Sequence, residues 1–140
     1  MRTGEELLRV GENATGPKMN EMRKNVLVYI SGPITPTDEM STEQHVAAAL
    51  KVFIRLTGEG IPSICVHLGA AFPSAYDLSY HTWMAYDLAV LGHCTHILML
   101  PGWEKSKGAV LERTFAVGRH IPIFYTVEEV VEMKWVLEKE

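Results

Sequence analysis

The residues of this sequence that could do chemistry are two carboxylates and the start of one helix. Ser106-Lys107-Gly108 opens a predicted helix, and Glu112 lies one turn further along it among apolar neighbours. Unpaired backbone N–H groups at a helix start can bind an anion, and a carboxylate in a partly dry wall is suited to attack a developing cationic carbon. Asp87 supplies a second acid within an apolar helical stretch. Cleavage of a glycosidic bond needs such a pair, because one carboxylate attacks the sugar C1′ and the other assists the leaving group.

Each of these residues also has a plainer interpretation. Ser106 could simply cap the helix, Glu112 could pair in solvent with Arg113 or Arg119, and Asp87 could be a surface acid. A Walker phosphate loop is excluded, because the Gly-x4-Gly-Lys-Ser/Thr spacing is absent.

Aromatic and metal-ligating residues give weaker signals. Tyr29, near the end of a predicted strand, could hold the attacking carboxylate in line or could be a core aromatic. Trp103, in a loop beside the expected site, is a better candidate for stacking on a base than Trp83, which suits the core equally well. The run 93–96 holds two histidines and a cysteine, but neighbours in a strand point to alternate sides and nothing completes a ligand shell. We therefore expect no metal and no cofactor.

The elements that must position these residues alternate between strand and helix. The predicted strands are 26–30, 61–66, 95–100 and 121–125, and the predicted helices are 41–58, 78–92, 108–119 and 127–139. Continuous apolar strands without period-two alternation indicate a parallel sheet that helices cover on both faces. We expect an α/β fold of three layers with a parallel four- to five-stranded sheet.

Ligands of such open sheets bind outside the carboxyl ends of the strands, so the loops after the first three strands are the place to look. The informative residues fall there and predict a small crevice. They are Ser31, Gly32, Pro33, Ile34, Thr35, His67, Gly102, Trp103, Ser106 and Gly108.

Length and composition bound the class of protein. A chain of 140 residues with 47% hydrophobic and 21% charged residues fits one globular domain, expected over 26–140, behind an extension over 1–25 with a short helix near 5–10 and a linker. The net charge of -4 argues against a nucleic-acid polymer as partner. The two cysteines lie in apolar stretches, and no signal peptide or membrane-spanning run is present, so we expect a cytoplasmic protein.

Three parts of the sequence together resemble the nucleoside 2-deoxyribosyltransferase superfamily, which includes the 2′-deoxynucleoside 5′-monophosphate N-glycosidases. They are Val28-Tyr-Ile-Ser-Gly-Pro-Ile34, Asp87, and Leu100-Pro-Gly-Trp-Glu-Lys-Ser-Lys-Gly-Ala-Val-Leu-Glu112. The resemblance covers about residues 26–125, although the loop after the first strand lacks the arginine that some monophosphate hydrolases use.

The resemblance implies a role for each matching residue. Glu112 would be the nucleophile, Asp87 its acid/base partner and Tyr29 the residue that orients the glutamate. The segment 31–35, with Ser106 and Gly108, would cradle the sugar or phosphate. It also implies a flavodoxin-like sheet and a homodimer or larger homo-oligomer.

The leading hypothesis is therefore a hydrolase that cleaves the N-glycosidic bond of a 2′-deoxynucleoside 5′-monophosphate through a covalent intermediate on Glu112. Transfer of the sugar to another base uses the same chemistry and is the close alternative. A non-catalytic nucleotide-binding module and a structural scaffold are hypotheses of other classes. An enzyme requires Glu112 and Asp87 to converge on one cavity, whereas a sensor or a scaffold does not.

Overall fold

The protein is built around a four-stranded parallel sheet. A computed structural model describes residues 15–71 and 77–135. The strands are β1 (Val28–Ser31), β2 (Ser63–Cys65), β3 (His96–Met99) and β4 (Ile123–Phe124). They lie in the order β2-β1-β3-β4, and each neighbouring pair is parallel. The predicted α/β fold with a parallel sheet is confirmed, and its strand order is that of a flavodoxin-like fold.

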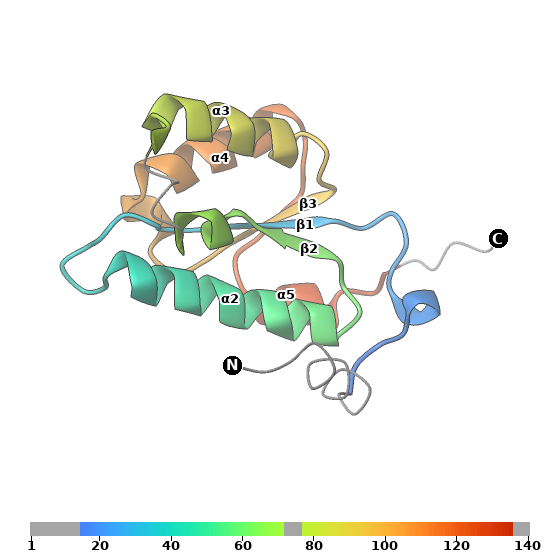
Figure 1. The fold of residues 1–140 in the computed structure, drawn as a ribbon. Helices are drawn as coiled ribbons and strands as arrows, with labels where there is room; N and C mark the ends of the chain where they lie inside the picture. Colours follow the sequence, from blue (N-terminus) through green and yellow to red (C-terminus); the bar gives the residue numbers. More distant parts are fainter. Residues whose placement is uncertain (1–14, 72–76, 136–140) are drawn as a thin grey trace.

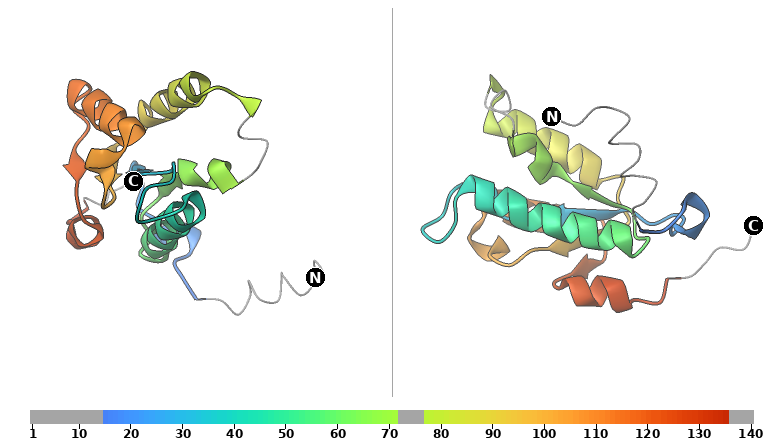
Figure 2. Two further views of the ribbon diagram at one scale, coloured as in Figure 1. Left: turned by 90° about the vertical axis from the view of Figure 1, so that its left-hand side faces the viewer. Right: turned by 60° about the horizontal axis from the view of Figure 1, so that its bottom comes forward.

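Two helices cover each face of this sheet, so the molecule has three layers (Figure 1). On one face lie α2 (Thr42–Gly58) and α5 (Val127–Glu132), and on the other lie α3 (Tyr80–Leu91) and α4 (Lys107–Gly118). The described residues also form short 3-10 helices, which are η1 (Met19–Glu21), η2 (Val66–Ala71) and η4 (Trp103–Lys105). The left view in Figure 2 shows α3 and α4 across the sheet from α2.

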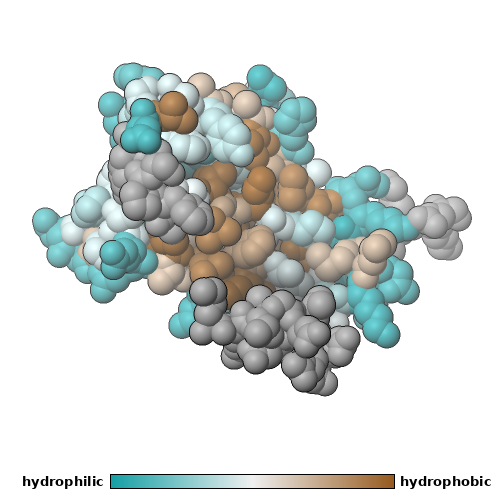
Figure 3. All heavy atoms as spheres, in the orientation of Figure 1, coloured by the Kyte–Doolittle hydropathy of each residue, from teal (hydrophilic) through white to brown (hydrophobic). Residues whose placement is uncertain are grey.

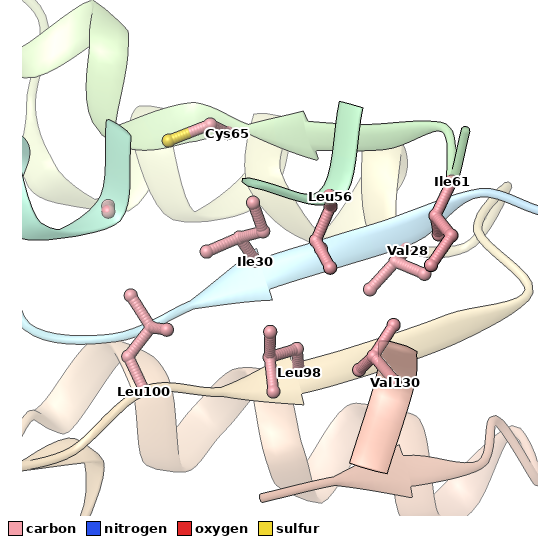
Figure 4. Packing of buried hydrophobic residues seen from close by; sticks show 9 residues of the cluster. Val28, Ile30, Leu56, Ile61, Cys65, Leu98, Leu100 and Val130 are labelled. Carbon is pink, nitrogen blue, oxygen red and sulfur yellow. The ribbon is translucent and has the colours of Figure 1, made fainter. Parts of the chain in front are cut away.

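Side chains of β1 alternate between the two faces and divide the core into two clusters. Val28 and Ile30 pack with Leu56 of α2 and Val130 of α5 (Figure 4). Tyr29 belongs to the cluster on the other face, which α3 and α4 cover. Both faces are buried, which explains why the sequence of this strand is apolar throughout except at its end.

An exposed apolar surface runs along the edge of the sheet that β2 forms. Figure 3 shows hydrophobic residues gathered between α3 and α2 on this side of the molecule. Ile54 of α2 and Leu68 of η2 are exposed large hydrophobic residues, at 61% and 37%.

Two glycines allow the carboxyl ends of β1 and β3 to approach each other. A Cβ on Gly32 would lie 2.9 Å from the Cβ of Leu100, closer than two carbons can pack. Gly102 has a φ of +87°, a left-handed conformation that favours glycine, and a Cβ there would lie 3.3 Å from Pro33. The loops that follow these strands therefore depend on both glycines.

Element boundaries differ from the prediction chiefly at the C-terminal helix. The sequence predicts a helix over 127–139, but α5 ends at Glu132 and Met133 is extended. The chain leaves the helix there because the Trp135 indole packs edge-on against His96, with ring centroids 4.9 Å apart.

The helix predicted near 5–10 lies outside the described residues. No helix within the described residues is both long and apolar enough to cross a bilayer.

Candidate active site

The candidate site lies at the carboxyl edge of the sheet, where the chain switches direction. β1 is followed through α2 by β2 on one side, while β3 pairs with β1 on the other side. Loops that leave neighbouring strands in opposite directions open a crevice at such a point. A cavity of about 610 Å³ occupies it, lined from the loop after β1, from η2, from α3 and from the start of α4.

Seven of the residues predicted from the sequence line this cavity. They are Gly32, Ile34, Thr35, Asp87, Ser106, Gly108 and Glu112. The two predicted acids therefore face one shared space, as the enzyme hypothesis requires.

Two hydroxyl groups of β1 hold the carboxylate of Glu112. The Tyr29 hydroxyl donates a hydrogen bond to Oε2, and the Ser31 hydroxyl donates one of 2.8 Å to Oε1. Residues two apart in a strand point to the same face, and here α4 covers that face and brings Glu112 onto it. Glu112 is only 5% exposed, and no arginine of the described residues pairs with its carboxylate. This contact removes the plain interpretation of Glu112 as a solvated partner of Arg113 or Arg119.

Burial sets the ionisation of this pair of groups. Desolvation raises the pKa of Glu112 to about 7, the charge of Asp87 adds to the rise, and the hydrogen bonds from Tyr29 and Ser31 oppose it. Burial and the charge of Glu112 raise the pKa of Tyr29 far above its ordinary value. The Tyr29 phenol therefore stays protonated and remains a donor to the carboxylate.

Asp87 reaches the cavity from one face of α3, the helix that packs beside α4. Tyr80, Trp83, Met84 and Asp87 all line the cavity, at the spacing of three, four and seven that places residues on one side of a helix. No hydrogen bond from a described residue reaches the Asp87 carboxylate, and burial raises its pKa to about 6. Because the charge of Asp87 also raises the pKa of Glu112, the two acids titrate as an interacting pair.

The start of α4 forms a polar end of the cavity. Ser106 caps the helix, since its side chain accepts from the amide of Ala109 at 3.2 Å, and its carbonyl accepts from the amide of Val110 at 2.9 Å. The plain interpretation of Ser106 as a cap is thus correct, and Ser106 lines the cavity as well. The N–H groups of Lys107 and Gly108 are the ones left for a ligand.

Other predicted residues lie close to the cavity but do not line it. Tyr29 and Ser31 lie behind Glu112 and are fully buried. Pro33 lies against Gly102 and faces a second, apolar cavity between α2 and α5. His67 is 1% exposed and is not part of the lining.

Trp103 also lies away from this cavity, and the indole that lines it belongs to Trp83. The left-handed turn at Gly102 directs η4 toward β4, where the Trp103 ring packs near Tyr125 and lies 5.2 Å from the guanidinium carbon of Arg113. Among the described residues, no group of three or more histidine, cysteine or acidic side chains is placed to hold a metal ion.

Tyr80, Met84 and Lys107 are among the wall residues that the sequence reasoning missed. The spacing of the first two before Asp87 is a signal that could have found them, because they share its helical face. Lys107 follows Ser106 directly, and its ammonium lies 5.8 Å from the centre of the Tyr80 ring.

Comparison with protein families finds one that spans the sheet and the site. The family described as Domain of unknown function (DUF4406) matches residues 26–125. The chain belongs to this family. Comparison with curated proteins found no match. The matched segment runs from before β1 to after β4, so Tyr29, Ser31, Asp87 and Glu112 all fall within it.

The buried carboxylate of Glu112 predicts a pH-dependent stability change for Glu112→Gln. Glu112 keeps its proton up to about pH 7 in the folded chain, against an ordinary pKa of 4.5. Its contribution to stability is therefore full below pH 4.5 and is lost as the pH rises through 7. Glutamine stays neutral, so at pH 8 Glu112→Gln should raise the free energy of unfolding by on the order of 1–3 kcal/mol.

Urea denaturation at pH 4 and pH 8 measures this difference. The wild type and Glu112→Gln should have similar free energies of unfolding at pH 4. Glu104→Gln, which changes an exposed residue, serves as the matched control. A Glu112→Gln protein that is no more stable than the wild type at pH 8 would contradict the account of burial.

Proposed function

We propose that this chain cleaves the N-glycosidic bond of a 2′-deoxynucleoside 5′-monophosphate and releases the free base. The supporting observation is the placement of Glu112, whose two oxygens are held by Tyr29 and Ser31 in the wall of a cavity that Asp87 also faces. A carboxylate fixed in this way is oriented for attack, and a second carboxyl nearby can give and take a proton.

The proposed reaction has two displacements at C1′ of the sugar. A carboxylate oxygen of Glu112 attacks C1′, the C1′–N bond breaks, and its electron pair leaves with the base, which takes the proton of Asp87. Water then attacks C1′ and gives a proton to Asp87, and the bond between C1′ and Glu112 breaks. The products are the base and 2-deoxyribose 5-phosphate, and both carboxyl groups return to their starting states.

The ionisation of the pair suits this sequence of steps. Burial brings the pKa values of Asp87 and Glu112 to about 6 and about 7, so the pair holds a single proton over a narrow range near neutral pH. Because the pKa of Glu112 is the higher of the two, the shared proton lies mostly on Glu112, and the reactive form is the minor one in which Asp87 carries the proton and Glu112 the charge. Positive charge that develops at C1′ favours this form over the reverse one.

The polar end of the cavity supports a phosphate on the substrate. The N–H groups at the start of α4 and the ammonium of Lys107 lie at the wall that also carries Glu112. A 5′-phosphate bound there would place the sugar one helical turn away, beside Glu112. The apolar wall formed by Trp83 and Met84 suits the base.

Loss of the nucleophile should abolish base release. We expect Glu112→Gln to lower kcat by about 10³-fold or more, because the covalent step has no other carboxylate in the same position. The assay is chromatography of free base from the four common 2′-deoxynucleosides and their 5′-monophosphates, with and without an added acceptor base. Undiminished turnover by Glu112→Gln, with Glu104→Gln as control, would rule out the assigned role.

The same assay distinguishes substrates and acceptors. Faster release of base from the monophosphates than from the nucleosides supports binding of the phosphate at the start of α4. A new nucleotide in the presence of the acceptor base would indicate transfer.

The pH dependence of kcat/KM should report the carboxyl pair. Wild-type kcat/KM should reach a maximum between about pH 6 and 7 and fall on both sides, since Glu112 must be ionised and Asp87 protonated. In Asp87→Asn the falling limb above pH 7 should vanish. The remaining rising limb should report Glu112 alone, at a pKa below the value of about 7 that it has beside a charged Asp87. A variant that keeps the bell-shaped profile would show that Asp87 is not the acid.

A further inference from the structure

His67 is a buried polar residue that the proposed chemistry does not use. It lies in η2, directly after β2, and is 1% exposed. Neither ring nitrogen makes a hydrogen bond with the described residues, although both are buried. Buried polar side chains are nearly always hydrogen-bonded, so an imidazole in this state points to a function.

The ring is neutral at the pH at which the cell works. Burial lowers the pKa of His67 to about 4, and the nearby His45 lowers it further, while the backbone of Gly32 and of Pro33 acts in the opposite direction. A neutral imidazole carries one N–H donor and one acceptor nitrogen. His67 is therefore available as a hydrogen-bond donor but not as a charge.

The backbone that acts on His67 belongs to the start of the loop that lines the candidate site. Both backbone groups raise the pKa of His67, and since Pro33 has no N–H group, the effect of Pro33 is that of its carbonyl oxygen. The residues that follow, Ile34, Thr35 and Pro36, line the cavity. The loop has no side-chain anchor at Gly32, because Leu100 leaves no room for a Cβ there.

We propose that His67 is a positioning residue, whose ring N–H donates to the carbonyl of Gly32 or Pro33 and fixes the loop 32–36 against a bound substrate. In the parallel pairing of β1 with β2, Ile30 lies beside Cys65, so Gly32 and His67 each follow two residues later at the same edge of the sheet, and the ring is buried there. A small shift of the loop toward η2 completes the hydrogen bond, and contact of the substrate with Ile34 and Thr35 holds the loop there. The class of ligand, a 2′-deoxynucleotide, rests on the proposed function, and the role of His67 requires that the cavity binds such a ligand, whether or not the chain cleaves it.

The test separates positioning from a structural role by measuring stability and binding together. His67→Leu removes the donor and leaves an apolar side chain, so it should leave the free energy of unfolding unchanged or raise it. It should weaken binding and raise KM by about tenfold, the equivalent of one hydrogen bond, with kcat changed by less than about threefold. Asparagine and glutamine place an amide donor where Nδ1 or Nε2 lies, so one of His67→Asn and His67→Gln should restore binding.

Binding is measured by calorimetry with the four common 2′-deoxynucleoside 5′-monophosphates, in proteins that also carry Glu112→Gln and so do not turn them over. KM and kcat are measured in proteins that keep Glu112. His93→Leu is the matched control, because His93 is exposed in the turn between α3 and β3, at the far edge of the sheet. Unchanged binding by His67→Leu would overturn the proposal, and so would joint loss of stability and binding that neither amide restores.

The outcomes also distinguish this proposal from the proposed function. If the wild type releases base and His67→Leu is unchanged, only the role of His67 is wrong. If the nucleotides bind without release of base, the proposed function fails, and the binding comparison still decides the role of His67. A wild-type chain that binds none of the nucleotides contradicts both.

Discussion

The burial of the Glu112 carboxylate between two hydroxyls of β1 is the constraint on which the site depends. Removing this group from water raises its pKa, and the donors Tyr29 and Ser31 offset part of that cost. The arrangement requires α4 to pack on the face of β1 to which odd-numbered residues point. The position of α4 therefore depends on the pleat of β1, and the geometry of the site depends on the packing of the core.

The strand order explains why groups distant in the sequence meet at this carboxylate. β1 lies between β2 and β3, and the loop after β1, the η2 turn, α3 and the start of α4 all border one cavity. Asp87 enters from α3, and the polar end is the cap of α4. Buried polar groups, among them Ser31, Glu112 and His67, lie in or behind its wall, where a fold optimised for stability alone would carry apolar side chains.

The fold was predictable from the sequence because each strand is an apolar run ended by glycine, proline or polar residues. The end of the helix after β4 was not predictable, because it depends on the packing of Trp135 on His96, a contact between distant segments. The acids Glu112 and Asp87 and the phenol Tyr29 were also identified from the sequence. The direction in which Trp103 leaves Gly102, the second hydroxyl on Glu112 and the burial of His67 depend on loop geometry and tertiary packing, which residue types and spacing do not specify.

The stereochemistry at C1′ tests the central claim most directly, because attack by Glu112 makes the reaction a double displacement. With methanol present, the intermediate should be captured as a methyl 2-deoxyriboside 5-phosphate, whose anomeric configuration proton NMR determines. Two displacements predict the β-anomer, with the configuration of the substrate retained. The α-anomer would mean that the acceptor attacks the substrate directly, and Glu112 would then not be the nucleophile.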